Sequence, residues 1–378
     1  MTARTPVVPA DPATGPERGP RQHAWVWLAA LLVTVGGVGA VAVAHTSDPP
    51  AHETVAGQGT SLSPNQVARL FDQPQPGLSA RRSIPNATGT RAADKQIAAV
   101  ATSRGYRRHG DPLDPLGTYQ GRRLQPRAIA DLEALQAAMR ADIGSSLTLT
   151  SAHRTPAHQR QLFRAQLTTS SVSLRGRIVT NNEIGLGLAD DVLHHAMRRA
   201  APPGFSRHHT GLTIDVAANG RGLFDFATTP AFDWLARDGY ANAMAYGWIP
   251  SYPAGSTGLG PEPEPWEWAW VGRDLARCAR AGSCVSGRLD ALSPQAMGWA
   301  HTSDGSPPAR LRLLTSEGTR ALDPVGVTRF DVAAALGVDA DHGFTAPVDL
   351  PADVRWACVE ARSAPGGPWN AVGCAELG

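Results

Sequence analysis

Residues 206–216, SRHHTGLTIDV, combine histidine and carboxylate side chains in a pattern that suits metal chemistry. Apolar residues stand at every second position of the last five, so Asp215 should lie on the opposite face of a strand from a row of core side chains. Gly211 permits a tight turn that brings His208 beside Asp215. An imidazole and a carboxylate at one point begin a divalent-metal site. The alternative is a histidine that is satisfied within the fold.

Residues 261–272, PEPEPWEWAWVG, place three glutamates among three tryptophans, with no basic residue. In a regular strand the tryptophans share one face and pack, and Glu267 lies on the other face. The prolines between the acids disturb that regularity, so Glu264 and Glu267 can both turn towards one site. Glu262 is expected at the surface. The alternative is an edge strand with exposed acids.

Residues 151–159, SAHRTPAHQ, predict a corner between a strand and a helix. Thr155 is a good N-cap and Pro156 suits the first helical turn, which leaves Arg154 at the corner. Side chains at such corners commonly face a cleft. An arginine there can hold a carboxylate through two parallel hydrogen bonds, whereas the alternative is an ordinary surface arginine.

The elements around these three stretches predict an α+β domain over residues 91–284. Residues 127–144 carry apolar side chains at helical spacing, and residues 145–151 alternate as a strand does. Another helix is expected to begin at Pro230 and to lead into the strand WIPSY at 248–252. The three motifs therefore lie at the ends of regular elements or within a strand.

An uncharged run at residues 24–44 decides the expected compartment. It is long enough to cross a bilayer as a helix, and the charges on its two sides keep the tail, residues 1–23, in the cytoplasm. We therefore expect a single-pass protein of the cell membrane with an extracytoplasmic body. The alternative is secretion after cleavage near Ala44. A net charge of +2 argues against nucleic acid as a partner.

The remaining segments predict a linker and a second domain. Residues 45–90 are rich in Pro, Gly, Ser and Thr, as linkers are, with one short helix expected at 64–71. Residues 287–378 show short apolar runs broken by turn residues, which predicts a small all-β sandwich. The four cysteines lie in the exported part, where disulfides form. The expected pairs are sequence neighbours: Cys278 with Cys284, and Cys358 with Cys374.

In this order the three motifs resemble those of the VanY-like D-alanyl-D-alanine carboxypeptidases, zinc peptidases of the LAS group that trim peptidoglycan stem peptides. The family's S-G-Y-R with a following Gln is matched at 151–159, its S-x-H-x-x-G-x-x-x-D at 206–215, and its E-P-W-H before an aromatic-V-G at 264–272. The resemblance covers roughly residues 127–272. It implies the LAS-type fold, a small antiparallel sheet with helices.

The resemblance also implies a role for each motif residue. It places metal ligands at His208 and Asp215, with zinc as the expected ion, and a general base for the attacking water at Glu264. The terminal carboxylate of the substrate would be held by three residues: Arg154, Gln159 and Ser206. The expected function is a membrane-anchored metallo-carboxypeptidase that removes the terminal D-alanine of stem peptides. Whether it prefers D,D- or L,D-bonds stays open.

One departure from the family pattern falls at a metal ligand. The third ligand is the histidine of E-P-W-H, and this chain has Glu267 there. Glutamate can bind zinc, but a second anionic ligand weakens the Lewis acidity of the ion and favours other, oxygen-preferring divalent metals. We take Glu267 as the third ligand, with His209 or His153 as possible substitutes. The alternative function is a pseudo-peptidase that binds cell-wall peptides without cutting them.

Short motifs in the C-terminal region are similar to those of a β-sandwich module appended to many secreted actinobacterial proteins. They are G-W-A at 298–300, R-F-D-V at 329–332 and H-G-F at 342–344. The resemblance implies no catalysis in this region, and we expect contact with the cell wall or with another secreted protein. The other expected partners are peptidoglycan stem peptides and the membrane.

Overall fold

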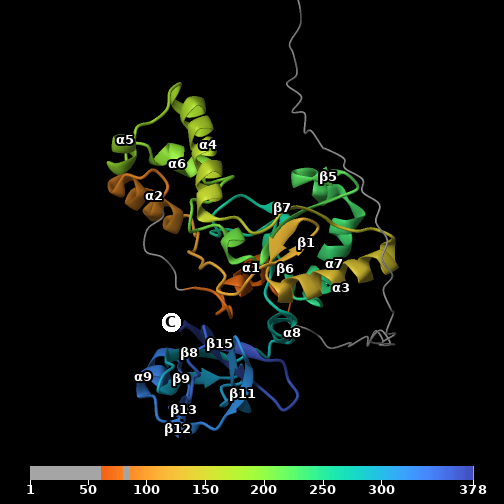
Figure 1. Cartoon of the computed structure of the whole chain (residues 1–378), viewed down its shortest axis with the longest axis vertical. Coiled ribbons are helices and arrows are strands. Elements are labelled where there is room, and N and C mark those ends of the chain that lie inside the picture. The colour runs from red at the N-terminus through yellow and green to blue at the C-terminus, as the bar shows by residue number, and fades with distance from the viewer. Residues whose placement is uncertain (1–60, 80–85, 378) are drawn as a thin grey trace, which may run out of the picture. The chain divides into compact units, whose positions relative to one another are not determined.

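The computed structural model of the chain describes residues 61–79 and 86–377 (Figure 1). The predicted cytoplasmic tail, the predicted membrane span at 24–44 and the first part of the predicted linker lie outside the described residues. Within the two described ranges, no helix is both long and apolar enough to cross a bilayer.

The region up to residue 282 holds an antiparallel sheet with helices around it, as the sequence predicts. The helical elements are α1 (Pro64–Arg69), η1 (Leu70–Asp72), α2 (Arg91–Ser103), α3 (Pro126–Ile143), α4 (Pro156–Arg175), α5 (Asn181–Gly185), α6 (Asp190–Ala196), η2 (Arg207–Thr210), η3 (Leu223–Thr228), α7 (Pro230–Met244) and α8 (Arg273–Ala281). The strands are β1 (Gly117–Tyr119), β2 (Arg122–Leu124), β3 (Thr148–Ser151), β4 (Thr213–Ala218), β5 (Arg221–Gly222), β6 (Trp248–Tyr252) and β7 (Glu264–Trp270). The main sheet has the order β3-β4-β7-β6, with β5 paired to β4, and β1 with β2 forms a separate hairpin.

The helix before β3 lies within one residue of its expected bounds, and the helix after β3 begins at the expected cap. In α4 the Thr155 hydroxyl accepts a hydrogen bond from the amide of His158, and Pro156 occupies the first turn. Both α3 and α4 end at a glycine in the left-handed region, Gly144 at φ 63° and Gly176 at φ 67°. The predicted strand-to-helix corner at Arg154 is therefore confirmed.

The helix predicted after Pro230 is interrupted. α7 contains four residues with non-helical backbone angles, from Arg237 to Tyr240, and three of them have positive φ. Gly239 adopts this conformation without steric cost, and beyond the break the side-chain amide of Asn242 donates to the carbonyl of Trp234. The expectation of one continuous helix is wrong here because the apolar spacing continues across a backbone break.

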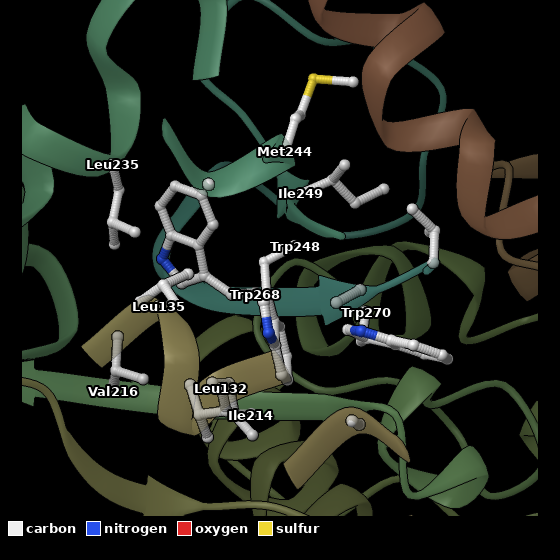
Figure 2. Close-up of a cluster of buried hydrophobic side chains, with 14 of the residues drawn as sticks. Leu132, Leu135, Ile214, Val216, Leu235, Met244, Trp248, Ile249, Trp268 and Trp270 are labelled. Atoms are coloured by element: carbon white, nitrogen blue, oxygen red, sulfur yellow. The ribbon is translucent and has the colours of Figure 1, made fainter. Parts of the chain in front are cut away.

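One face of the sheet packs against α3 and α7 in the largest apolar cluster (Figure 2). All three tryptophans of the stretch 261–272, Trp266, Trp268 and Trp270, are buried in this cluster. Leu132 and Leu135 of α3 belong to the same cluster. The predicted packing role of the tryptophans is confirmed.

The polar ends of two of these rings are also satisfied. The Trp270 indole donates to Asp131 at 2.8 Å, and the Trp268 indole donates to the carbonyl of Pro265 at 3.0 Å. Burial of these two rings therefore leaves neither indole N–H without an acceptor, and the bond to Asp131 connects β7 to α3.

Leu132 gives a direct test of this core. Replacing it with alanine should lower the free energy of unfolding by about 2–5 kcal/mol, because the side chain is fully buried and leaves a cavity. The measurement is urea unfolding followed by tryptophan fluorescence. Leu186, which is 65% exposed, is the matched control, and its alanine variant should stay within about 0.5 kcal/mol of the wild type. Equal effects of the two variants would contradict this packing.

A second apolar cluster joins α2, α4, α5 and α6, which lie together in Figure 1. Ile97, Phe163, Ile184 and Leu193 represent the four helices in it. These helices form a layer separate from the main core, and α4 connects that layer to the strand β3.

The linker predicted at 45–90 is folded in part. The short helix expected at 64–71 is present as α1 and η1, but it packs into the main core through Val67 and Phe71. The Arg207 guanidinium donates to the carbonyl of Ala68 at 3.1 Å and lies 4.9 Å from the ring centroids of both Phe71 and Tyr252. The linker prediction is therefore wrong for α1 and η1.

The C-terminal region is β-rich, as predicted. Its elements are β8 (Ser286–Ala291), β9 (Gln295–His301), β10 (Arg310–Thr315), β11 (Gly318–Leu322), β12 (Val325–Val327), α9 (Phe330–Leu336), β13 (Gly343–Pro347), β14 (Trp356–Arg362) and β15 (Asn370–Glu376). Two four-stranded antiparallel sheets, β11-β10-β14-β15 and β12-β13-β9-β8, share one apolar cluster. The presence of α9 corrects the all-β expectation, because the R-F-D-V motif opens a helix.

Both predicted disulfides are present. Cys278 of α8 bonds to Cys284, which follows the helix. Cys358 of β14 bonds to Cys374 of β15. The second pair occupies directly opposed positions of the two strands, which fixes their register.

Candidate active site

Three neighbouring strands bring polar side chains into one row across the sheet. Asp215 of β4 pairs with Ser151 of β3 on one side and with Glu267 of β7 on the other. Side chains of residues in register on adjacent strands point to the same face. Residues from all three sequence motifs therefore lie on one face of the sheet.

His208 reaches this row from the turn before β4. The turn is η2, which ends at Gly211 with φ 67°, and a Cβ at that glycine would lie 2.8 Å from the Leu116 side chain. The His208 ring donates from Nδ1 to the carbonyl of Ala152 at 2.6 Å. That bond fixes the ring and directs Nε2 towards the carboxylates, as backbone partners do for metal-binding histidines.

His208, Asp215 and Glu267 form a cluster that could hold a metal ion. Nε2 of His208 lies 3.2 Å from Oδ1 of Asp215 and 3.3 Å from Oε2 of Glu267. One ligand atom from each residue can be chosen so that all lie within 4.8 Å of one another. All three side chains are buried, and each has an oxygen or nitrogen without a hydrogen-bond partner among the described residues. Buried polar atoms normally have partners, so this donor set fits a divalent cation.

The electrostatics of the cluster also favour a cation. Burial and the charge of Arg154 lower the pKa of His208, but the carboxylates of Asp215 and Glu267 outweigh them and raise it to about 9. Burial alone would raise the pKa of Asp215, yet His208 and Arg154 hold it below its usual value. The cluster is thus negative enough to keep a proton, or an ion in its place, on Nε2.

Arg154 lies beside the cluster and makes a contact that the sequence does not predict. Its guanidinium forms an ion pair with Asp215 Oδ2 and donates from Nε to the Ser151 hydroxyl at 2.8 Å. Its backbone amide donates to the carbonyl of His208 at 3.2 Å. The arginine is therefore held against a candidate metal ligand, and it retains further donors for a substrate carboxylate.

A cavity of about 230 Å³ opens beside the cluster, between α4, the segment after α6, and β7. Arg154, Gln159, Ser206, Glu264 and Glu267 all contribute to its wall. The structure therefore brings every predicted site residue together, since His208 and Asp215 contact two of these five. The chemical role of each residue stays a prediction.

Glu264 lies in the cavity wall and has a shifted pKa. Burial raises its pKa well above the usual range of a glutamate, and the negative charges of Glu267 and Asp215 raise it further. A carboxylate with a raised pKa takes up a proton more readily near neutral pH. That property is required of a general base that later acts as an acid.

Gln159 offers the cavity both a donor and an acceptor. Its amide nitrogen donates one hydrogen to the carbonyl of Ala201 at 2.8 Å, which leaves the second hydrogen. Its buried carbonyl oxygen has no partner among the described residues. Gln159 can therefore donate to a carboxylate, as predicted, and also accept from a peptide N–H.

Glu262 lies outside the cluster, as expected, and so do His194 and His195 of α6. Glu262 accepts a hydrogen bond from Arg198 Nε at 2.6 Å. His194 is exposed in α6, and His195 contacts the Ser170 hydroxyl at 3.0 Å. Neither histidine joins a metal-binding group among the described residues.

His209 and His153 do not replace Glu267 as a third ligand. Both ring nitrogens of His209 are used by the backbone, Nδ1 by the carbonyl of Arg154 at 2.7 Å and Nε2 by the amide of Gly204 at 2.9 Å. His153 does not belong to the cluster that the described residues form. The substitutes considered from the sequence are therefore wrong, and His209 has a structural role.

A His209→Ala variant tests that role. It should lower the free energy of unfolding by about 1–3 kcal/mol, because two backbone groups lose their partner in a largely buried place. Bound metal per folded chain should not change. Unfolding and metal content would be measured together, with the exposed His194→Ala as control. Loss of metal from a folded His209→Ala protein would restore His209 as a ligand.

Several residues of the cavity carry no sequence signal. Tyr106 follows α2, Tyr252 ends β6, and Arg199 follows α6, and all three line the cavity. Tyr252 is the cross-strand partner of Glu264, a relation set by the register of β6 and β7. Because these residues come from segments outside the motifs, only the tertiary fold identifies them.

A comparison with family models finds a match over the region that contains the site. The family model described as VanY: D-alanyl-D-alanine carboxypeptidase matches residues 121–273. Residues 121–273 are a VanY-type domain. The match contains all three motifs, so the family prediction made from them is confirmed. A search of curated proteins gave no match.

Solved structures with similarity to the chain carry related names. One is VanYB in complex with D-Alanine-D-Alanine, 25% identical over 44% of this chain and 82% of its own, with a TM-score of 0.35. Another is the LdcB LD-carboxypeptidase, 26% identical over 43% of this chain and 66% of its own, with a TM-score of 0.32. A third is DacB from Streptococcus pneumoniae D39, 26% identical over 42% of this chain and 72% of its own, with a TM-score of 0.28.

Proposed function

We propose that the chain is a membrane-anchored, extracytoplasmic metallo-carboxypeptidase that hydrolyses the terminal D-alanine of peptidoglycan stem peptides. The VanY-type domain supports the class of reaction. The observation that carries the proposal is the convergence of three buried ligand atoms without partners, from His208, Asp215 and Glu267, beside a cavity that also holds Arg154 and Glu264.

The residues would divide the reaction as follows. His208, Asp215 and Glu267 would hold the divalent ion, zinc in the first instance, which supplies Lewis acidity for the scissile carbonyl and lowers the pKa of water. Glu264 takes a proton from the attacking water as the new C–O bond forms. It then delivers that proton to the leaving amine as the C–N bond breaks.

Arg154 would fix the position of the cut. Its remaining N–H donors pair with the terminal carboxylate of the peptide, helped by the free amide hydrogen of Gln159 and by Ser206. Because the arginine is held against Asp215, the carboxylate and the scissile bond are kept one residue apart. Positioning of this kind makes the enzyme a carboxypeptidase rather than an endopeptidase.

The decisive experiment uses the full chain, purified in detergent. Incubated with a peptide ending in D-Ala-D-Ala, it should release one D-alanine, detected by mass spectrometry, and chelation should stop the release until zinc is restored. A parallel peptide ending in a single D-Ala after an L-centre reports L,D-cleavage. No release from either peptide with zinc, manganese or cobalt would overturn the proposal.

Membrane attachment has its own experiment. The uncharged run at 24–44 supports anchoring, with the C-terminal body outside the cytoplasm. The chain should remain in the membrane fraction after a carbonate wash. A soluble product that begins after Ala44 would instead support secretion.

Glu267 favours a second candidate function, a protein that binds wall peptides without cutting them. With two carboxylates, the donor set His208, Asp215 and Glu267 weakens the Lewis acidity on which hydrolysis depends. Peptide binding that needs Arg154 but no added metal would support this candidate. One tightly bound zinc per chain would count against it.

A further inference from the structure

Arg199 is a cation in the cavity wall that the proposed mechanism does not use. It follows α6 and lines the cavity with Leu162 of α4. Its guanidinium lies over the ring of Phe224, 5.5 Å from the ring centroid. Phe224 in turn packs edge-on against Trp266, with centroids 4.7 Å apart and an interplanar angle of 82°.

This stack orders the arginine without neutralising it. A cation over a ring face is held by the electrons of the ring, and its in-plane N–H donors stay free for other partners. Within the described residues, Arg199 has no ion pair with a carboxylate. Phe224 is itself 49% exposed, so an ordered guanidinium stands where solvent and a ligand can reach it.

The neighbouring arginines provide the contrast. Arg198 is paired with Glu262, and Arg154 is paired with Asp215. Arg199 therefore differs from them in two ways. Its guanidinium is ordered by the Phe224 ring, and its charge is not neutralised by a carboxylate among the described residues. Such a residue suits the binding of a planar anion, above all a carboxylate held by two parallel hydrogen bonds.

We infer that Arg199 binds a second carboxylate of the substrate, on the side chain of the residue that precedes the terminal dipeptide. The inference rests on the proposed function, in which Arg154 takes the terminal carboxylate. A second cation in the same cavity then serves an acidic group further along the peptide. The substrate class is a stem peptide whose diamino acid carries a free side-chain carboxylate, rather than one that is amidated or lacks it.

Phe224 is the positioning residue for this contact. Without its ring, the long Arg199 side chain would lose its fixed orientation and would have to be ordered by the ligand. Phe224→Ala should therefore lose part of the preference for the acidic peptide. Arg199→Lys should also lose part of it, since an ammonium keeps the charge but lacks the planar fork.

The experiment measures binding and turnover of two peptides by the full chain. The peptides end in D-Ala-D-Ala and differ only in a carboxylate or a carboxamide on the side chain before the terminal dipeptide. Wild type should bind the carboxylate peptide about 10- to 100-fold more tightly, the range for a charge-assisted hydrogen-bonded pair. Arg199→Gln should remove that preference and leave binding of the carboxamide peptide within about threefold of wild type.

Arg198→Gln is the matched control. It removes the same charge one residue away from Arg199, and the Arg198 side chain is already paired with Glu262. It should preserve the preference. Equal binding of both peptides by wild type, or equal weakening of both by Arg199→Gln, would overturn the inference. If wild type discriminates but cleaves neither peptide, the proposed hydrolysis fails while the inference stands. Binding of neither peptide would reject both.

Discussion

Glu264→Gln should lower kcat/KM for the release of terminal D-alanine by about 10²- to 10⁴-fold, the usual contribution of a general base. This corresponds to about 3–5 kcal/mol in the activation barrier. Glutamine keeps the volume of the side chain in the cavity wall but cannot accept the proton of the attacking water. Metal content should be unchanged, because Glu264 does not belong to the cluster of candidate ligands.

Glu262→Gln is the control for this variant. Glu262 lies two residues earlier, pairs with Arg198 and does not line the cavity, so its loss should change kcat/KM by less than about twofold. Steady-state kinetics and metal analysis on the same preparations separate the possible roles. If Glu264→Gln loses its metal together with its activity, Glu264 is a ligand. If it keeps activity within about threefold, the base lies elsewhere.

Much of the site could be predicted because local patterns decide it. The alternation of apolar residues in β4 puts Asp215 on the polar face, and Gly211 makes the turn that returns His208 to that face. The cap at Thr155 fixes the corner that carries Arg154. Each of these features depends on neighbours within about one turn or one strand, which is the range over which sequence patterns are informative.

The rest depends on packing between distant segments. The ion pair of Arg154 with Asp215, the place of Arg199 at the cavity and its contact with Phe224 follow from how α4, α6 and η3 surround the sheet. No short pattern encodes these contacts. The linker prediction fails for a related reason, because a Pro-rich composition hides the few residues of α1 and η1 that pack into the core.

The contact of Arg154 with Asp215 also decides which substitutions can separate metal binding from peptide binding. An arginine that neutralises a candidate ligand and faces the substrate affects both functions when it is changed. Loss of activity in an Arg154 variant would therefore not say which function failed. Glu267 belongs to the ligand cluster, and within the described part of the chain it forms no ion pair with Arg154, so its variants report on the metal more directly.

Glu267→His should keep the metal and raise kcat/KM by on the order of tenfold, the change that one pKa unit in the attacking water would produce. The substitution removes one negative charge from the donor set and leaves His208 and Asp215 in place. A weaker anionic field around the ion strengthens its Lewis acidity. Glu267→Ala is the matched variant, and it should lose metal affinity by more than about 100-fold, because only two of the three donors remain.

These two variants separate the candidate functions when metal content, thermal unfolding and D-alanine release are measured on each. Activity that appears only in Glu267→His would identify the native chain as a peptide-binding protein whose hydrolysis is suppressed by its third donor. Activity in the wild type that Glu267→His destroys, with metal retained, would mean that the carboxylate itself is needed, and the argument from Lewis acidity would be wrong. If Glu267→Ala keeps its metal, then His208 and Asp215 hold the ion without Glu267, and the contact of 3.3 Å between His208 and Glu267 is structural.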